Sequence, residues 1–466
     1  MPRLPLATPL AALALAAGLM AAPSTAAAPA SAPAAAAVAA PTAARAANPV
    51  TPGNFTGFGF DQCLAPTQKS MNRWWLHSPY QAVGIYISGD SRACRSQPNL
   101  TPAWISRQLA IGWRLLPIIL GPQASCQPRF PRYADDFRIN PTPGRNGQYS
   151  VARKQGRTEA VKNAADAKRL GIAPGSTLWY DLEGFNLGDT RCRESALAFV
   201  SGWSVQTKKL GFRTGMYSSA SSGIKMLDDA RRAGRTDVTL PEFIWLARWD
   251  GIANTSSTYI TNDGWRPGGR MKQYLGGHDE VHGGVRINID SNYLDLGTGS
   301  RALPENRCGG TRIGFPDYTP LRPPKAGRTS PAPLVKAMQC LLKEHGVYAG
   351  AISGSYDAAT RTAVNAWQAR TGATRSMWWS RANWMSAFAA GPSGATQVVK
   401  FGSYGPHVRR VQRALNAASP TTKLVPTGTA DTRTSNAIKA WQRTVGLPPT
   451  GVINSRGWAL LRAAKR

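Results

Sequence analysis

Near its centre the chain reads Ser176-Thr177-Leu178-Trp179-Tyr180-Asp181-Leu182-Glu183-Gly184, a short apolar and aromatic run that ends in two carboxylates. Side chains two residues apart on a β-strand point to the same face, so Asp181 and Glu183 would project together, with Cα atoms roughly 7 Å apart. Two carboxylates at the carboxyl end of a buried strand are typical of barrel enzymes that cleave glycosidic bonds. The triplet alone also fits a solvated acidic pair that caps a loop, so the flanking sequence has to decide.

The sequence on either side of this run predicts an α/β fold. Eight short apolar runs alternate with longer segments of helical character such as Thr158–Leu170 and Glu194–Leu210. The runs are Phe55–Asp61, Gly84–Ser88, Leu115–Gly121, Leu178–Glu183, Thr214–Ser218, Phe243–Ala247, Met271–Tyr274 and Val285–Asp290. Eight strand–helix units in about 240 residues predict a (β/α)8 TIM-like barrel rather than an open doubly wound sheet. No glycine-rich phosphate loop follows the first run, so we expect no dinucleotide or other cofactor.

Acidic residues fall at the ends of three of these runs. Asp61 ends the first run, Asp181 and Glu183 end the fourth, and Asp290 ends the eighth. The carboxyl ends of barrel strands meet at one face, where barrel enzymes place their active sites. Aromatic faces stack on sugar rings, and amides bond to sugar hydroxyls. The predicted substrate-binding residues are therefore Tyr86, Tyr217, Trp245, Gln273 and Tyr274. Together these residues predict a carbohydrate-binding cleft.

Four short motifs carry a family resemblance: Gly59-Phe60-Asp61-Gln62-Cys63, Trp179-Tyr180-Asp181-Leu182-Glu183, Gly215-Met216-Tyr217-Ser218-Ser219, and Gln273-Tyr274 followed by Asp290. This half of the chain resembles the actinobacterial glycoside-hydrolase-like barrel domain, which is similar to the barrel-fold, lysozyme-type muramidases. The resemblance implies that Glu183 is the general acid and that Asp181 orients or stabilises the positive intermediate. It further implies that Asp61 and Asp290 tune that pair and hold the sugar. A non-catalytic barrel that binds glycan without cutting it is the alternative.

The composition describes a strongly basic chain. Its 466 residues carry a formal net charge of +31, with a pI of about 10.6. Such a surface favours polyanions, which include nucleic acid, anionic membranes and anionic cell-wall polymers. Because the N-terminus predicts export, we expect wall polymers rather than nucleic acid.

The N-terminus has the three parts of a secretory signal peptide. Arg3 precedes an apolar run from Leu10 to Ala22, and small residues follow from Ser24 to Ala28. The apolar run is too short to span a membrane comfortably, so we expect cleavage and no stable membrane insertion. The segment from Pro29 to Val50 is rich in Ala, Pro and Thr and predicts an unstructured linker.

The chain has an even number of cysteines, which predicts disulfides in an exported protein. None of the six forms a C-x-x-C pair, so we expect neither a zinc ribbon nor a thioredoxin-type redox site. Fifteen pairings are possible. We expect neighbours in sequence order to pair: Cys63 with Cys94, Cys126 with Cys192, and Cys308 with Cys340.

One histidine-containing segment competes for a metal. His278 and His282 are four residues apart between paired glycines, with Glu280 between them. A zinc peptidase would place its glutamate directly after the first histidine, on a helix. We therefore interpret Gly276–Gly284 as a glycine-rich loop and expect no metal site.

Beyond a Pro, Gly and Arg-rich linker the chain repeats itself. Val335–Leu342 returns as Val408–Leu415, and Thr360–Gln368 returns as Thr434–Gln442. Each copy predicts three helices. The recurring Gln, Thr-x-x-Ala and Trp-Gln resemble the peptidoglycan-binding type 1 repeat, and Trp367 and Trp441 are expected to be core residues.

The two copies differ after the second predicted helix. Thr374–Trp379 stands where the second copy has Leu447–Gly451, which predicts altered or abolished binding in the first copy. Residues 329–466 hold eighteen Lys and Arg against three Asp and Glu. That excess suits attraction to an anionic wall.

These observations predict a secreted, cell-wall-associated protein whose partner is peptidoglycan. The expected parts are a signal peptide (1–28), a linker (29–52), a barrel (53–300), a second linker (301–332) and two repeats (333–395 and 400–466). The expected activity is hydrolysis of glycan strands, and the alternative is a wall-binding protein without activity.

Overall fold

The computed structural model describes residues 48–129, 131–132, 136–391 and 397–466. The expected signal peptide and most of the linker that follows it lie outside these residues. Within the part of the chain that is described, no helix combines the length and the apolar character needed to cross a membrane.

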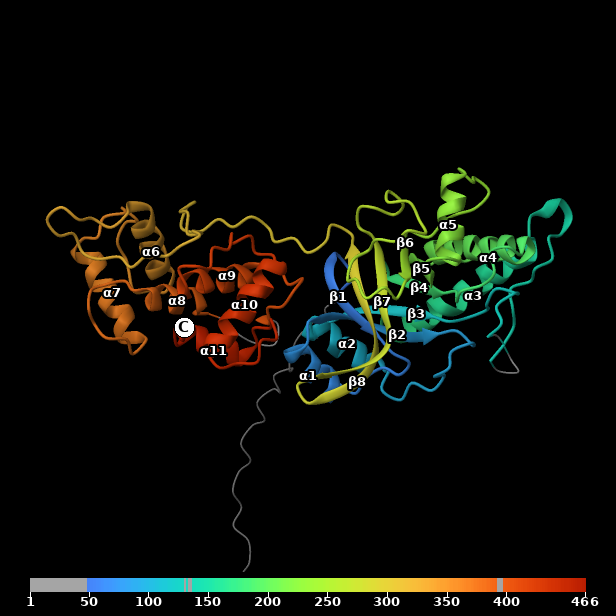
Figure 1. The fold of residues 1–466 in the computed structure, drawn as a ribbon, viewed down its shortest axis with the longest axis horizontal. Helices are drawn as coiled ribbons and strands as arrows, with labels where there is room; N and C mark the ends of the chain where they lie inside the picture. The colour runs from blue at the N-terminus through green and yellow to red at the C-terminus, as the bar shows by residue number, and fades with distance from the viewer. Residues whose placement is uncertain (1–47, 130, 133–135, 392–396) are drawn as a thin grey trace, which may run out of the picture. The chain divides into compact units, whose positions relative to one another are not determined.

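Eight strands close into a barrel in which each strand pairs with its neighbour in sequence (Figure 1). They are β1 (Phe55–Asp61), β2 (Tyr80–Ser88), β3 (Arg114–Ile119), β4 (Thr177–Asp181), β5 (Arg213–Ser219), β6 (Phe243–Ala247), β7 (Gly269–His282) and β8 (Val285–Leu296). Strands β1 to β7 run parallel. The expected α/β class and the eight-stranded barrel are thus confirmed.

The last strand departs from the expected all-parallel arrangement. β8 is antiparallel to both β7 and β1. Gly283 and Gly284, with φ of 58° and 78°, form the tight turn between β7 and β8. Such a short turn makes a hairpin, because a parallel return needs a crossover of a dozen residues or more. The glycine-rich loop expected at Gly276–Gly284 is therefore wrong, since β7 continues to His282.

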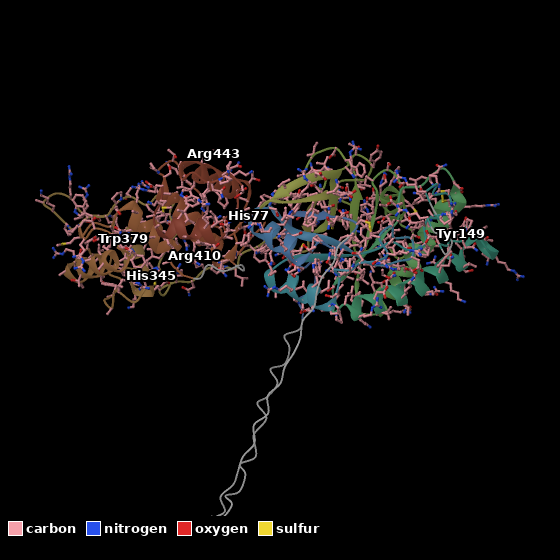
Figure 2. The ribbon with its side chains drawn as sticks, turned by 90° about the horizontal axis from the view of Figure 1, so that it is seen from below. His77, Tyr149, His345, Trp379, Arg410 and Arg443 are labelled. Atoms are coloured by element: carbon pink, nitrogen blue, oxygen red, sulfur yellow. A yellow bond between two sulfur atoms is a disulfide. The ribbon has the colours of Figure 1, made fainter. Side chains whose placement is uncertain are left out.

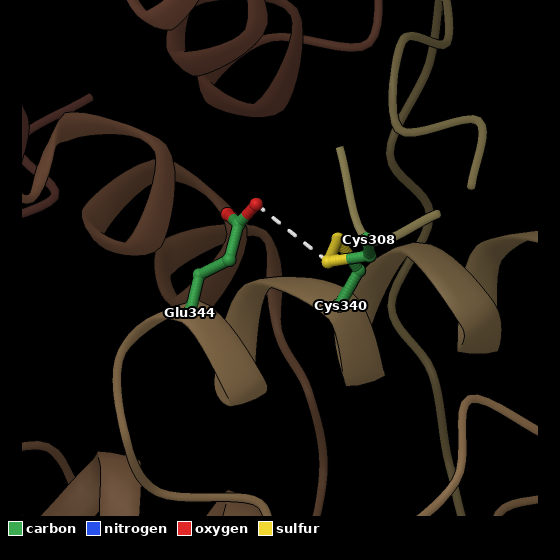
Figure 3. A group of neighbouring side chains, drawn as sticks. All are labelled: Cys308, Cys340 and Glu344. Atoms are coloured by element: carbon green, nitrogen blue, oxygen red, sulfur yellow. Dashed lines mark hydrogen bonds between the residues drawn. A yellow bond between two sulfur atoms is a disulfide. The ribbon is translucent and has the colours of Figure 1, made fainter. Parts of the chain in front are cut away.

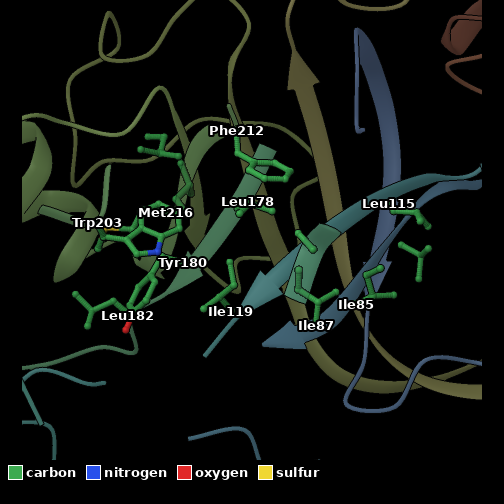
Figure 4. Packing of buried hydrophobic residues seen from close by; sticks show 14 of the residues in the cluster. Ile85, Ile87, Leu115, Ile119, Leu178, Tyr180, Leu182, Trp203, Phe212 and Met216 are labelled. Carbon is green, nitrogen blue, oxygen red and sulfur yellow. The ribbon is translucent and has the colours of Figure 1, made fainter. Parts of the chain in front are cut away.

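Helices cover the outside of the parallel strands (Figure 1). They are α1 (Gln68–His77), α2 (Pro102–Ile111), α3 (Ser150–Arg169), α4 (Thr190–Lys209) and α5 (Gly223–Arg232), with a short 3-10 turn η1 at Arg145–Gly147. Thr67 and Asp189 cap α1 and α4 by accepting hydrogen bonds from backbone N–H groups of the first turn. Apolar side chains such as Ile85, Leu178 and Trp203 fill the layer between strands and helices (Figure 4).

A second cluster fills the inside of the barrel. Phe55, Leu116, Trp179, Trp245 and Leu294 are all buried there. The barrel is therefore a packed core and not a pore, so a ligand has access only at its ends.

Beyond the barrel, the described residues form a helical region. Its helices are α6 (Ala332–Glu344), α7 (Ala358–Arg370), α8 (Arg381–Ala389), α9 (Pro406–Ala418), α10 (Thr432–Thr444) and α11 (Ser455–Arg462). Trp367 and Trp441 are buried, as expected. Trp379, labelled in Figure 2, is also buried. Tyr318 and Leu321 belong to the stretch expected to be a linker, yet both are fully buried in this helical core.

Three disulfides join cysteines that are neighbours in sequence order. They are Cys63–Cys94, Cys126–Cys192 and Cys308–Cys340. The third ties the segment before the helices to α6, with the Glu344 carboxylate beside it (Figure 3).

Candidate active site

The predicted acids meet at one end of the barrel, in a cleft made of two adjoining hollows of about 620 Å³ each. Both hollows are lined by Tyr86, Glu183, Trp249 and Asp290. Asp61 lines one hollow and Asp181 the other. The carboxylates of β1, β4 and β8 therefore share one cleft, although Asp290 lies in the middle of an antiparallel strand.

Asp61 and Asp290 are opposite each other where β8 closes on β1. Asp61 is buried and accepts hydrogen bonds from Asn292 Nδ2 at 2.6 Å and Gln273 Nε2 at 3.2 Å. Burial, followed by the negative charge of Asp290, raises the pKa of Asp61 to about 8. Burial also raises the pKa of Asp290. At neutral pH the Asp61 carboxyl therefore keeps its proton beside Asp290.

Asp181 is the last residue of β4, and Glu183 lies just beyond it. The Asp181 side chain is buried, and its Oδ1 atom has no hydrogen-bond partner among the described residues. Burial, with the charges of Glu183 and Asp61, raises the pKa of Asp181 well above its usual range. A buried carboxyl oxygen without a partner is uncommon and is often found at functional sites.

Gln123 fixes the position of the Asp181–Glu183 pair. Its Nε2 donates to the Asp181 carbonyl at 2.8 Å, and its Oε1 accepts from the Glu183 backbone N–H at 2.9 Å. Glu183 itself is half-buried. Sequence reasoning missed Gln123, because it lies in a loop after β3 with no motif around it.

Gln273 connects the acids to the aromatic side of the cleft. Its Oε1 accepts from the Tyr217 hydroxyl at 3.0 Å and from Trp249 Nε1 at 2.9 Å. Its Nε2 donates to Asp61 and, at 3.3 Å, to Asp290. Gln273 is buried, so this residue predicted to bind substrate orients the side chains that line the cleft.

The other predicted substrate-binding residues divide into two groups. Tyr86 and Tyr217 line the cleft. Trp245 does not, because it is buried inside the barrel, where its Nε1 donates to Asn292. Tyr274 is likewise absent from the lining of both hollows. Trp249 takes the expected aromatic place: it is 66% exposed and lines both hollows, although sequence reasoning did not select it.

Arginines line the cleft as well as acids. Arg92 and Arg132 line one hollow and Arg129 the other. Arg92 donates to the carbonyls of Gly89 at 2.8 Å and Tyr86 at 3.1 Å. Acids, arginines and an exposed indole together suit a sugar with polar substituents better than an apolar ligand.

Metal-ligating side chains gather at one place among the described residues, where Cys308, Cys340 and Glu344 lie together. Both sulfur atoms belong to a disulfide there and are not thiolate ligands (Figure 3). In the histidine-containing segment, Glu280 accepts hydrogen bonds from His282 and from the Tyr80 hydroxyl. This segment therefore ties the β7–β8 hairpin to β2.

Comparison with protein families covers both halves of the chain. Residues 72–294 match the family described as the Rv2525c-like, glycoside hydrolase-like domain. Residues 331–374 and 404–461 match the putative peptidoglycan binding domain. No curated protein matches the chain.

Similar solved structures cover about half of the chain. The first is an uncharacterized B. stearothermophilus protein (19% identity, 51% of this chain and 95% of that chain, TM-score 0.33). The second is the Mycobacterium tuberculosis Tat-secreted protein Rv2525c (14% identity, 52% and 96%, TM-score 0.33). The third is the modular autolysin LytC from Streptococcus pneumoniae (11% identity, 51% and 46%, TM-score 0.32).

The eight-stranded barrel, the acids at its mouth and the two family matches agree with one another. The chain therefore carries an Rv2525c-like, glycoside hydrolase-like domain followed by two matches to the putative peptidoglycan binding domain.

Proposed function

We propose that this chain is an exported, cell-wall-associated glycosidase that hydrolyses the glycan strands of peptidoglycan. The observation that carries the proposal is the meeting of Asp61, Asp181, Glu183 and Asp290 in one cleft. The peptidoglycan-binding repeats support the same substrate, because attachment to the wall raises the local concentration of glycan.

Glu183 is the proposed general acid. It lines both hollows, and Gln123 holds its backbone in place. Its carboxyl group would donate a proton to the glycosidic oxygen as the bond from that oxygen to the sugar carbon breaks. A water molecule then adds to the sugar carbon and gives up one proton, which restores the Glu183 carboxyl and completes the hydrolysis.

Asp181 is the proposed partner that stabilises positive charge on the sugar. Asp181 lines the cleft, and its buried Oδ1 has no hydrogen-bond partner among the described residues. At neutral pH the pair formed by Asp61 and Asp290 retains one proton and so carries less negative charge. Asp181 can then ionise when positive charge develops on the sugar. Tyr86, Tyr217 and Trp249 would hold the sugar rings.

The proposal includes the arrangement of the chain. The barrel at 53–300 is a variant of the (β/α)8 TIM-like barrel with an antiparallel last strand, and 333–395 and 400–466 are three-helix modules. Removal of the signal peptide at 1–28 would release the protein to the wall, without stable membrane insertion. Peptidoglycan and anionic wall polymers are the proposed partners, and nucleic acid is not.

Release of reducing ends from purified peptidoglycan tests the activity. The mature chain should release them, and Glu183→Gln should lose at least about a hundredfold in rate, which is the usual contribution of a general acid. Glu242→Gln is the matched control, because Glu242 is paired with Arg213 and does not line the cleft. Equal rates for the native chain and Glu183→Gln would contradict the assignment.

A second function, glycan binding without hydrolysis, is favoured by one observation. Burial raises the pKa of the Asp181 carboxyl well above its usual range and so favours its neutral form, and a neutral carboxyl stabilises a sugar cation poorly. If neither the native chain nor Glu183→Gln releases reducing ends while both sediment with the wall, the barrel is a binding domain.

A further inference from the structure

The turn between the second and third helices is built alike in the two repeats, despite their different sequences. Gln368 Nε2 donates to the Trp378 carbonyl at 2.8 Å, and Gln442 Nε2 donates to the Val452 carbonyl at 2.9 Å. Trp379 and Ile453 follow, each in a two-residue antiparallel bridge with an earlier segment. Trp378 of the first repeat therefore occupies the position of Val452 in the second.

Backbone conformation supports this correspondence. Gly451 has φ of 75°, and Met377 has φ of 52° at the same place. Methionine rarely adopts the left-handed region, whereas glycine does so readily. The Tyr356 hydroxyl holds the turn by donating to the Met377 carbonyl at 2.6 Å. The first repeat thus keeps the turn without its glycine. The strained residue Met377 directly precedes Trp378.

The equivalent face is covered in the second repeat. Val452 is 3% exposed and belongs to the hydrophobic cluster that fills the layer between the barrel strands and their helices. Its neighbour Lys400 is fully buried, and Lys400 Nζ donates to the carbonyls of Trp75 at 2.8 Å and Tyr80 at 2.7 Å. That face of the second repeat is therefore occupied by protein.

The same face is open in the first repeat. Trp378 is 48% exposed. Arg322, which corresponds to Lys400 in the paired bridges, places its guanidinium 4.1 Å from the centre of the Trp378 ring. Arg375 is exposed nearby in the sequence, and neither arginine forms an ion pair with a carboxylate of the described residues. The arginine therefore packs on the indole, while about half of the Trp378 side chain stays exposed.

We propose that Trp378, with Arg322 and Arg375, forms a glycan-binding site that only the first repeat possesses. An exposed indole can stack on the C–H surface of a sugar ring, and two cations without carboxylate partners suit an acidic substituent on that sugar. The ligand class is therefore a pyranose that carries a carboxylate. The identity of the ligand rests on the proposed function. The inference adds that the first repeat, which lacks the turn glycine, attaches the protein to the wall.

Binding of soluble fragments of purified peptidoglycan tests the site. The full chain is used with Glu183→Gln present throughout, so that the fragments stay intact, and in enough salt to screen surface charge. Trp378→Val, which supplies the residue of the second repeat, should weaken the apparent Kd about fivefold to tenfold. Trp378→Phe should keep most of the affinity, and Val425→Ala, an exposed apolar residue of the second repeat, should keep all of it.

Two further readouts separate the outcomes. Arg322→Gln should weaken binding of the acidic fragments and leave binding of neutral chitin oligosaccharides unchanged. Unchanged affinity for Trp378→Val, or equal loss for Val425→Ala, would overturn the proposal. Failure of the native chain to release reducing ends would overturn the proposed hydrolysis alone, because binding is measured without turnover.

Discussion

Asp61 and Asp290 illustrate how burial sets the chemistry of single residues in this cleft. The two side chains come from adjacent strands, and the Asn292 and Gln273 amides reach the same carboxyl of Asp61. Hydrogen bonds from amides favour the ionised carboxylate, whereas burial and a neighbouring acid oppose it. Burial is the larger effect, so Asp61 has a pKa of about 8.

This shift predicts a pH-dependent stability. The folded protein keeps a proton on Asp61 that the unfolded chain releases above the ordinary pKa of 3.8. The contribution is fully present below that pKa and is lost as the pH rises through about 8. Asp61→Asn should therefore flatten the fall of Tm between pH 5 and pH 9 and should be more stable than the native chain at pH 9.

Thermal unfolding over that pH range checks the prediction. Asp279→Asn is a matched control, because hydrogen bonds from Asn288 and Arg286 hold the pKa of exposed Asp279 below its usual range. Its effect therefore falls below pH 4, and its Tm profile should parallel that of the native chain above pH 5. Parallel profiles for Asp61→Asn and the native chain would show that Asp61 is not protonated in the fold.

At the scale of elements, the helices α3 and α4 approach each other unusually closely. A Cβ atom on Gly156 would lie 2.1 Å from the Phe199 carbonyl oxygen, and one on Gly202 would lie 2.2 Å from the Arg153 carbonyl oxygen. Both contacts are with backbone, which cannot rotate away as a side chain can. The two helices that flank β4 in sequence are therefore locked together, and they support the strand that carries Asp181.

Gly202→Ala should separate the two helices and destabilise the fold by about 1–3 kcal/mol, the usual cost of overpacking. Each kcal/mol corresponds to a fall in Tm of about 2–4 °C in a domain of this size. Differential scanning calorimetry measures the change.

Ser204→Ala on the same helix is the control. Its buried hydroxyl has no partner among the described residues, so its removal should be neutral or slightly stabilising. An unchanged Tm for Gly202→Ala would mean that α3 and α4 can move apart without loss.

At the scale of the whole molecule, charge is concentrated in the C-terminal part. Residues 329–466 contain eighteen Lys and Arg and three Asp and Glu, an excess of fifteen positive charges. Exposed charges interact with an anionic polymer over a Debye length that shrinks as salt is added. Charge should therefore dominate attachment to intact wall, whereas the Trp378 site should persist in high salt.

Retention on intact wall should fall steeply between about 0.05 M and about 0.5 M salt, while binding to fragments freed of anionic polymers should change far less. Co-sedimentation at a series of salt concentrations measures both. Wall retention that is independent of salt would contradict a role for anionic wall polymers.

Much of the architecture could be predicted from local patterns. The eight apolar runs located the eight strands, and the recurring helices located the repeats, because both signals depend on the spacing of side chains along the chain. The direction of β8 could not be predicted in this way, since parallel and antiparallel strands can show the same spacing of apolar side chains. The Gly283-Gly284 turn was the available signal, and it was interpreted as part of a loop.

The candidate site was predicted less completely. Asp61, Asp181, Glu183 and Asp290 were found because they end or follow apolar runs. Gln123 and Trp249 were missed, because their roles depend on contacts with residues more than twenty positions away. Trp245 was wrongly predicted to bind substrate, since it is buried inside the barrel. Its depth there depends on the stagger between neighbouring strands, which the sequence of one strand does not reveal.

The sequence by itself determined the class of the barrel, the acids that lie along its strands, the even number of cysteines and the existence of two related helical units. These properties follow from spacing and chemical type, which are local. Tertiary structure alone decided the proton on Asp61, the contacts of Gln273 and the exposure of Trp378 against the burial of Val452. The pKa of a side chain, its hydrogen bonds and its exposure all depend on the groups that surround it. Many of these groups are distant in sequence, and only the folded chain brings them together.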